Sequence, residues 1–505
     1  MSPVLIDGTT LTCNDVVSVA RRKKAAGVAP GVRERVERSR NVVESLAARD
    51  AVVYGITTGF GHLARVKIPG GEIESLQRNL ILSHAVGTGS PFPDEVVRAM
   101  ILLRANSLAK GLSGVRFEVI ETLLKLLEAD ISPLVPEKGS LGASGDLAPL
   151  AHLALALLGE GDVRVSGARV PARKALERAG IAPLTLGPKE GLALINGTQA
   201  MTAAGTLALY DAGALAATAD AAACLSIEAL RGIPAAFDEK IHDRARPHPG
   251  QAACARTLRR LLEGSRLVSA PGELRVQDAY SLRCVPQIHG ATRDVLSYVR
   301  NVVETEINSA SDNPLVFEDG SVISGGNFHG QPVALAMDFL CIAVSELGSV
   351  SERRIERLLN PALSELPAFL VRRDGVNSGF MIAHYTAAAL VSENKVLSSP
   401  ASVDSIPVSA AQEDHVSMGT IAARKARQVV DNVARVLAVE LMCACQAVDF
   451  RGPENLAPAT RRVYDAVREV VPPLEADRWL HPDLEAVTGL VVQGKIAELV
   501  LRTPR

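Results

Sequence analysis

Aromatic residues are scarce in this chain of 505 residues, in which Phe, Trp and Tyr together make up 3% and tryptophan occurs once. The apolar share is nevertheless 47%, and Ala, Leu and Val supply most of it. Such a composition favours closely packed helices over aromatic-rich β-structure. An excess of charge is also missing, because 54 basic and 56 acidic residues leave a formal net charge of −2. The interspersed charges exclude the basic footprint that a nucleic acid or an anionic membrane would need.

A cysteine framework is absent as well. The 7 cysteines are odd in number and scattered, and no CxxC motif occurs, so neither a disulfide scaffold nor a zinc site is indicated. The 10 histidines form no HExxH motif, and we predict no structural or catalytic metal. The first residues lack a basic start followed by an apolar run, and the most apolar segment, 147–158, is too short to span a bilayer. We therefore expect a cytoplasmic protein.

Helical periodicity dominates what is present. Long helical patterns cover 197–230, 332–359 and 415–450, whereas strand-like alternation is confined to 4–11 and to hairpin-like pieces around 163–170 and 315–323. The prediction is a mainly all-α fold, a bundle of long helices with small β additions. Helices of about 30 residues exceed the usual globular length, which suggests faces shared between subunits, although a monomeric bundle would leave a similar trace.

Two regions are expected along the chain. Residues 1–200 form a mostly helical N-terminal region, and residues 201–505 form the long-helix bundle with a C-terminal helical region. The two could pack tightly enough to be one structural unit.

The stretch GSLGASGDLAPLAH at 139–152 has two interpretations. In the first it is a helix start, with Ser144 or Asp146 as the N-cap and Pro149 in the first turn of a helix over 147–158. Its glycine spacing matches neither the GxGxxG nor the P-loop pattern, so we predict no nucleotide.

In the second interpretation the backbone itself becomes reactive. Gly145 has no Cβ, so its nitrogen can approach the carbonyl carbon of Ala143 closely and close a five-membered ring. Loss of water from the ring and from the Ser144 side chain leaves a methylidene group conjugated to a carbonyl and an imine. This product is an electrophile, which no unmodified side chain offers. The two interpretations are compatible, because a helix N-terminus stabilises negative charge on the ring oxygen.

Several strings distributed over nearly the whole chain resemble the aromatic amino acid ammonia-lyases, in the order in which that family has them. Besides GSLGASGDLAPLAH they are VYGITTGFG (53–61), LQRNLILSHAVGTG (76–89), GLALINGTQA (191–200), VQDAYSLRCVPQIHG (276–290), SDNPLVF (311–317), GGNFHG (325–330) and QEDHVSM (412–418). The resemblance implies a helical fold of the fumarase/aspartase type. It also implies that Ala143, Ser144 and Gly145 form the MIO group, 4-methylideneimidazole-5-one, autocatalytically.

The same resemblance assigns roles to individual residues. Tyr54 is implied as the base that removes the β proton, and it needs nearby positive charge or hydrogen-bond donors because its reference pKa is near 10. Arg283 is implied as a bidentate clamp on the substrate carboxylate. The other implied site residues are the amides Asn196 and Gln277, which suit the MIO oxygen, the amine or the carboxylate, and Tyr280 and Phe328, which flank the ring and the substrate.

Within the family, the pattern is most similar to the members that act on histidine. His84, after Ser83, and Glu413 match both nitrogens of an imidazole, whereas a phenyl ring would leave Glu413 buried and unpaired at a cost of roughly 2–7 kcal/mol or more. The implied reaction converts L-histidine to trans-urocanate and ammonia, the first step of histidine degradation, in a homotetramer whose active sites are shared between subunits. Two departures from the pattern, Thr57 and Ala411, affect loop geometry more than the reaction type.

Three rivals remain at this point. The first is the same chemistry on another ring, in a tyrosine or phenylalanine ammonia-lyase or in an MIO-dependent aminomutase. The second is a fumarase- or aspartase-like lyase, whose serine-rich GSSxMPxKxN-type loop this chain lacks. The third is an inactive helical scaffold, which would show no mass loss at residues 143–145.

Overall fold

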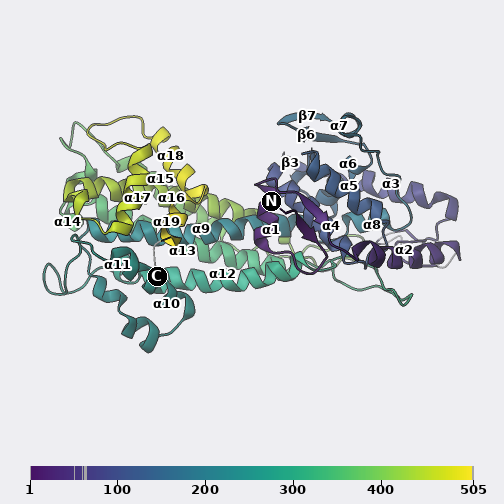
Figure 1. Ribbon diagram of the computed structural model, residues 1–505, viewed down its shortest axis with the longest axis horizontal. Coiled ribbons are helices and arrows are strands. Elements are labelled where there is room, and N and C mark those ends of the chain that lie inside the picture. Colours follow the sequence, from purple (N-terminus) through teal and green to yellow (C-terminus); the bar gives the residue numbers. More distant parts are fainter. Residues whose placement is uncertain (1, 50–51, 60, 62–64, 503–505) are drawn as a thin grey trace. The chain divides into compact units, whose positions relative to one another are not determined.

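The computed structural model describes residues 2–49, 52–59, 61 and 65–502. Helices dominate it and the strands are short (Figure 1), which confirms the predicted mainly all-α fold. The predicted helices over 197–230 and 332–359 are α9 (Gln199–Ala229) and α13 (Gln331–Leu359). With α12 (Val285–Ile307) and α16 (Gly419–Arg451), these are the longest helices of the described residues.

The chain divides into two compact units. The first comprises residues 1–207, 300–338 and 400–424, and the second comprises 208–299, 339–399 and 425–505. Four of the boundaries fall within α9, α12, α13 and α16, and the boundary at residues 399 and 400 falls in the loop that precedes α16. The first unit thus includes residues 300–338 and 400–424, which lie beyond the predicted boundary at residue 200. That boundary stays a prediction.

Packing of three helices in the first unit positions the site. Helices α3, α6 and α8 contact one another pairwise, and α6 is apolar almost all round, which lets it lie between neighbours. The His84 end of α3, the start of α6 and the Asn196 end of α8 are therefore held by one core. The helices of this unit are α1 (Cys13–Ala20), α2 (Val32–Ala48), α3 (Ile73–His84), α4 (Asp94–Ala109), α5 (Phe117–Glu128), α6 (Leu147–Leu157), α7 (Ala172–Arg178) and α8 (Glu190–Ile195), with a 3₁₀ turn at Gly70–Glu72.

The β structure consists of small additions. The predicted hairpins are confirmed as β6 (Asp162–Val165) with β7 (Ala168–Pro171), and β8 (Leu315–Val316) with β9 (Val322–Ile323). The predicted strand near the N-terminus is β1 (Val4–Ile6), which pairs in parallel with β2 (Ala26–Val28). Three further strands of two to four residues are too short to show alternation, and they are β3 (Thr88–Pro91), β4 (Ser132–Pro133) and β5 (Pro136–Lys138).

The second unit is helical in the part of the chain that the structure describes. A buried ion pair between Arg354 of α13 and Glu440 of α16, with Nη2 and Oε2 2.8 Å apart, lies in its core. Its shorter helices are α10 (Pro249–Leu262), α11 (Tyr280–Arg283), α14 (Pro361–Ser364), α15 (Met381–Leu397), α17 (Pro458–Val470), α18 (His481–Val492) and α19 (Lys495–Leu501), with short 3₁₀ or π turns at Pro234–Phe237, Lys240–Ala245, Ala368–Leu370 and Pro453–Asn455.

The predicted helix over 415–450 is right in its end and wrong in its start. Helix α16 stops at Arg451, before Gly452-Pro453, but it begins only at Gly419. The preceding residues are held outside the helix because the Val416 N–H donates to Ser405 Oγ (3.0 Å) and the Met418 N–H donates to the Leu141 carbonyl oxygen (3.0 Å). A tertiary contact with the segment around residue 141 therefore replaces one turn of helix.

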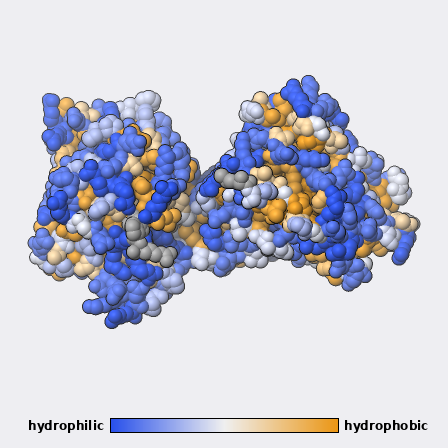
Figure 2. All heavy atoms as spheres, in the orientation of Figure 1, coloured by the Kyte–Doolittle hydropathy of each residue, from blue (hydrophilic) through white to orange (hydrophobic). Residues whose placement is uncertain are grey.

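Two helices, α9 and α13, are long and apolar enough by composition to cross a membrane. Their most apolar windows are 89% and 67% buried within the structure, as in the core helices of a globular protein. Hydrophilic side chains cover much of the face shown in Figure 2, with hydrophobic side chains gathered between them. Exposed apolar side chains on α13 of the second unit include Phe339 and Ile342.

Candidate active site

The Ala143-Ser144-Gly145 segment is a tight turn directly before α6. Gly145 pairs with Gly142 and Ala143 in isolated β-bridges, so the chain folds back on itself here. Gly145 has φ +75°, and a Cβ at this position would lie 2.2 Å from the carbonyl oxygen of Gly197. Only glycine fits such a position. The small residues, the reversed backbone and the missing Cβ satisfy what ring closure between residues 143 and 145 requires, so the turn fits the MIO group.

Asp146 holds this turn in place. It occupies the N-cap position of α6, as one of the two predicted caps, but its side chain makes no capping hydrogen bond. Its carboxylate instead accepts hydrogen bonds from the Ser140 hydroxyl (2.9 Å), the Met201 N–H (2.8 Å) and the Thr420 hydroxyl. Burial raises the pKa of this carboxyl. Three segments far apart in sequence thus meet at the residue that follows the tripeptide.

Ser144 is paired with the amide of Asn196. The Ser144 hydroxyl donates to Asn196 Oδ1 at 3.2 Å, and Asn196 Nδ2 donates to the carbonyl oxygen of Asn313 at 2.9 Å. Asn196 is buried just after α8. The structure therefore brings Asn196 to the tripeptide.

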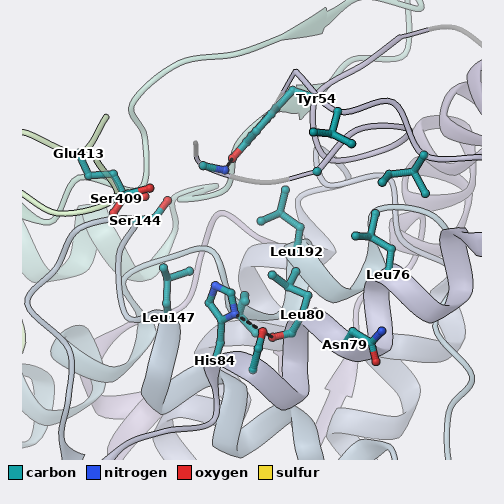
Figure 3. A pocket seen from close by; sticks show the side chains of 16 residues that line it. Tyr54, Leu76, Asn79, Leu80, His84, Ser144, Leu147, Leu192, Ser409 and Glu413 are labelled. Atoms are coloured by element: carbon teal, nitrogen blue, oxygen red, sulfur yellow. Dashed lines mark hydrogen bonds between the residues drawn. The ribbon is translucent and has the colours of Figure 1, made fainter. Parts of the chain in front are cut away.

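A cavity of about 590 Å³ lies beside the turn. Figure 3 shows Ser144, Ser409 and Glu413 close together on one side, His84 approaching from α3, and aliphatic side chains such as Leu76, Leu80 and Leu192 along the wall. A neighbouring hollow of about 240 Å³ shares His84 and Glu413 and is lined by Ala143 and Gly145. The residues lining the larger cavity are Tyr54, Gly59, Gly61, Val66, Ile68, Leu76, Asn79, Leu80, Ser83, His84, Ser144, Leu147, Leu192, Ile195, Ser409 and Glu413.

Tyr54 lies in this cavity, and its environment disfavours the phenolate. Burial, with smaller contributions from the charges of Glu413 and Asp312, raises the pKa of Tyr54, while the Gly61 N–H, which donates to the hydroxyl at 3.3 Å, opposes the shift. Of the two kinds of activator expected, positive charge or hydrogen-bond donors, the Gly61 N–H supplies a donor, and no lysine or arginine is among the described residues that line the cavity. The string at 53–61 also includes Phe60, which lies outside the described residues.

His84 and Glu413 line the same cavity as Tyr54 and Ser144. The His84 Nδ1 atom lies 3.0 Å from Ser83 Oγ, whose hydroxyl donates to the Leu80 carbonyl oxygen at 3.1 Å. One tautomer satisfies both contacts, with the proton on Nδ1 and with Nε2 left as an acceptor. Burial lowers the pKa of His84 and raises that of Glu413, so it favours the neutral form of both groups.

Asn196 contacts Ser144 without lining the cavity, and four other predicted site residues line neither this cavity nor the neighbouring hollow. Gln277, Tyr280 and Arg283 belong to the second unit, and Phe328 is a half-buried residue of the first. The Arg283 guanidinium lies 4.7 Å from the centre of the Tyr280 ring, and its Nε atom is buried without a hydrogen-bond partner among the described residues. Tyr280 is 69% exposed. The roles assigned to these four residues stay predictions.

Sequence analysis missed three residues around the tripeptide. Ser409 lines the cavity. Lys189 and Asp312 form an ion pair, and Asp312 Oδ1 accepts a hydrogen bond from Asn196 Nδ2. Asp312 falls within the string SDNPLVF, which was a usable signal. Nothing in the sequence distinguishes Lys189 from an ordinary surface lysine, because burial is set by the fold.

One group of metal-ligand residue types occurs away from this cavity. Asp220, Cys254 and His289 of the second unit offer ligand atoms within 4.8 Å of one another. The Asp220 carboxylate is already paired with His289 Nδ1 (2.8 Å) and with the Arg293 guanidinium. Because a cation at this place would compete with a guanidinium, the group carries little indication of a metal, and the absence of a metal stays a prediction.

The helical fold, with a cavity that brings a reversed Ala-Ser-Gly turn together with a tyrosine, a histidine and a glutamate, fits a lyase that acts on a carbon–nitrogen bond, and comparison with known proteins shows that class. The sequence profile described as aromatic amino acid lyase matches residues 11–469, and the chain belongs to this family.

Relatives and solved structures agree with this assignment. The chain is 59% identical to the histidine ammonia-lyase of Symbiobacterium thermophilum, over 98% of this chain and 97% of that protein. The crystal structure of histidine ammonia-lyase from Trypanosoma cruzi matches with a TM-score of 0.93 and 46% identity, over 100% of this chain and 96% of the other. Tyrosine aminomutase from Streptomyces globisporus matches with a TM-score of 0.96 and 42% identity, over 99% of both chains.

Proposed function

We propose that this lyase is a histidine ammonia-lyase, which converts L-histidine to trans-urocanate and ammonia in the first step of histidine degradation. The observation that carries the proposal is that His84 and Glu413 line the same cavity as Ser144 and Tyr54. The MIO group, formed from Ala143, Ser144 and Gly145, supplies the electrophile that makes the substrate amine a better leaving group. The chain's own residues bind and orient the substrate and move its β proton.

His84 and Glu413 select the substrate ring. A neutral imidazole carries one N–H and one acceptor nitrogen, and it needs one acceptor and one donor opposite them. His84 and Glu413 line the cavity from separate segments, so each of them can pair with one nitrogen of the imidazole. A phenyl ring would leave both groups unpaired in a half-buried site.

A second candidate is an ammonia-lyase or an aminomutase that acts on tyrosine or phenylalanine. The aliphatic wall of the cavity, with Leu76, Leu80 and Leu192, favours this candidate, because a carbocyclic ring would pack well against it. The similarity to a tyrosine aminomutase points the same way. The two polar groups weigh more, since leaving a polar group unpaired costs more than an imperfect apolar contact.

Tyr54, whose hydroxyl accepts a hydrogen bond from the Gly61 N–H, is proposed as the base for the β proton. The substrate carboxylate needs a cation, and no lysine or arginine is among the described residues that line the cavity. Arg283, the predicted clamp, belongs to the second unit. We therefore propose a homotetramer in which neighbouring subunits supply Arg283, together with Gln277, Tyr280 and Phe328, to each cavity.

The reaction as proposed needs no nucleic acid, membrane or metal, and we place the enzyme in the cytoplasm. None of the seven cysteines, all of them among the described residues, takes part in a disulfide, as is usual in a reducing compartment.

The test of the function is ultraviolet absorbance of the purified protein with L-histidine, L-tyrosine and L-phenylalanine in parallel. Each ammonia-lyase product has a new conjugated double bond, so turnover appears as rising absorbance, whereas an aminomutase yields a saturated β-amino acid that chromatography of the same reactions detects. A rise with histidine alone is expected. A rise with tyrosine or phenylalanine would support the second candidate. No rise in absorbance with any of the three amino acids, together with no mass deficit at residues 143–145, would refute both candidates.

A further inference from the structure

Lys189 is an unusual residue for its position. Its side chain is fully buried, and its backbone has φ +69° in the left-handed region at the N-cap of α8. Non-glycine residues rarely adopt this conformation and lysine is rarely buried. A residue that combines both features is held there by its surroundings, and those surroundings lead to the tripeptide.

The partner of Lys189 is Asp312. Lys189 Nζ lies 2.6 Å from Asp312 Oδ2, and both side chains have 0% exposure. The other oxygen, Oδ1, accepts the Asn313 N–H at 2.7 Å and lies 3.4 Å from Asn196 Nδ2. Lys189 thus fixes one oxygen of the carboxylate while the second oxygen faces the amide of Asn196.

Arg104 holds the backbone of Asn196 in place. Its Nη1 donates to the Asn196 carbonyl oxygen at 2.8 Å and its Nη2 donates to Ser107 Oγ at 3.0 Å. The side chain is fully buried, and burial lowers the pKa of Arg104 to about 10. A Cβ on Gly197 would lie 2.5 Å from its Nη1, so the guanidinium is packed against the residue that contacts Gly145.

These contacts determine which end of the Asn196 amide faces Ser144. The NH₂ end lies toward Asp312 Oδ1 and the Asn313 carbonyl oxygen, so Oδ1 is left toward the Ser144 hydroxyl at 3.2 Å. With the amide reversed, its oxygen would face a carboxylate and a carbonyl, which repel it. We infer that Lys189 and Asp312 are positioning residues that orient Asn196 toward Ser144 and thereby promote closure and dehydration of the tripeptide.

Stability alone does not account for the pair. Replacing a buried ion pair by apolar side chains of similar volume is often neutral or stabilising. The pair here costs desolvation of two ions and a left-handed residue, while the second carboxylate oxygen, which accepts the Asn313 N–H, also lies toward the amide of the site residue Asn196. The inference rests on the proposed function, because it concerns formation of the MIO group.

The experiment follows the mass deficit at residues 143–145 over time in full-length protein made by cell-free synthesis, with the melting temperature measured in parallel. In Asp312→Asn, which no longer holds a charged Lys189, we expect dehydration to slow roughly tenfold, as for loss of a hydrogen bond to a charged group. In Lys189→Met/Asp312→Leu, which removes both charges of the pair and also takes the Asp312 charge away from buried Arg104, dehydration should likewise be slow, and the melting temperature shows how much stability the pair supplies.

Glu440→Gln is the matched control, since it makes the same acid-to-amide change in the buried Arg354–Glu440 pair of the second unit. It should lower the melting temperature without slowing dehydration. Normal dehydration in Asp312→Asn, or equal slowing in Glu440→Gln, would overturn the inference. A wild-type protein without any mass deficit would instead contradict the proposed function, so the two failures are distinguishable.

Discussion

Polar side chains with unused hydrogen-bonding capacity define the cavity at the scale of single residues. His84 and Glu413 are each partly buried, and burial shifts the pKa of both toward the neutral form. The two groups line one cavity, and an imidazole has one donor and one acceptor nitrogen for them to pair with. We propose that recognition of the substrate ring depends on these two side chains, which come from separate segments of the first unit.

Glu413→Gln tests this division of roles. The amide keeps the size of the side chain and can still donate an N–H, but it cannot carry charge, so the variant tests whether the carboxyl group itself is needed. We expect kcat/KM for histidine to fall about 10- to 100-fold, as for loss of a hydrogen bond to a charged or strongly polar group. Steady-state kinetics with histidine and phenylalanine measure the change in preference.

Asp414→Asn is the control for Glu413→Gln. It alters the adjacent carboxylate, which is exposed and does not line the cavity, and it should leave both rates nearly unchanged. Equal losses of kcat/KM in Glu413→Gln and Asp414→Asn would mean that the negative charge of this segment matters and that contact of Glu413 with the substrate ring does not.

At the scale of elements, the tripeptide turn depends on how α6 and α8 are joined to it. The Asp146 N–H donates to the Gly197 carbonyl oxygen at 2.7 Å, and the same carbonyl lies against Gly145. The start of α6 is therefore bonded to the segment that follows α8, and the turn is closed between them. Sequence periodicity locates α6 correctly, but the bond that closes the turn joins residues about fifty positions apart.

Gly145→Ala should break this closure. The new methyl group would meet the Gly197 carbonyl at 2.2 Å and would require φ near +75°, which together cost about 1–3 kcal/mol or more. We expect a protein with a lower melting temperature and no mass deficit at residues 143–145, measured by thermal unfolding and intact-mass spectrometry.

Gly180→Ala provides the comparison, because Gly180 has φ +67° with nothing within 4 Å of the added methyl group. It should lower stability by about 1–2 kcal/mol and leave the mass deficit intact. Complete dehydration in Gly145→Ala would show that the turn tolerates a Cβ and that the close approach is unnecessary.

At the scale of the whole molecule, residues with implied catalytic roles divide between two compact units. Tyr54, Ser144 and Glu413 belong to the first, whereas Gln277, Tyr280 and Arg283 belong to the second. The cavity has no cation among its described lining residues. A carboxylate substrate in such a cavity requires positive charge from elsewhere, and a neighbouring subunit is the proposed source.

Co-expression of two inactive variants tests whether a neighbouring subunit supplies this positive charge. Tyr54→Phe and Arg283→Met should each abolish most turnover, and co-expression of the two should restore part of it, because some sites in a mixed tetramer then combine an intact Tyr54 with an intact Arg283. Ultraviolet absorbance with histidine and native mass spectrometry of the mixed assemblies give the readout.

Tyr54→Phe mixed with Ser144→Ala is the matched negative control, since both residues line the same cavity of one chain. This pair should not restore turnover. Restoration by the control pair, or none by the first pair in confirmed mixed tetramers, would argue against sites shared between subunits.

Sequence alone determined the helical class, the long helices α9 and α13 and the two hairpins, because these depend on local periodicity and on residues that are adjacent in the chain. The proposal for the Ala143-Ser144-Gly145 tripeptide came instead from the resemblance of motifs along nearly the whole chain. The tertiary structure decided where α16 begins, since Met418 bonds to Leu141 in preference to its own helix. It also decided that Lys189 is buried against Asp312 and that the pKa of Tyr54 is raised. Burial and charge depend on which distant segments meet, and a sequence pattern does not contain that information.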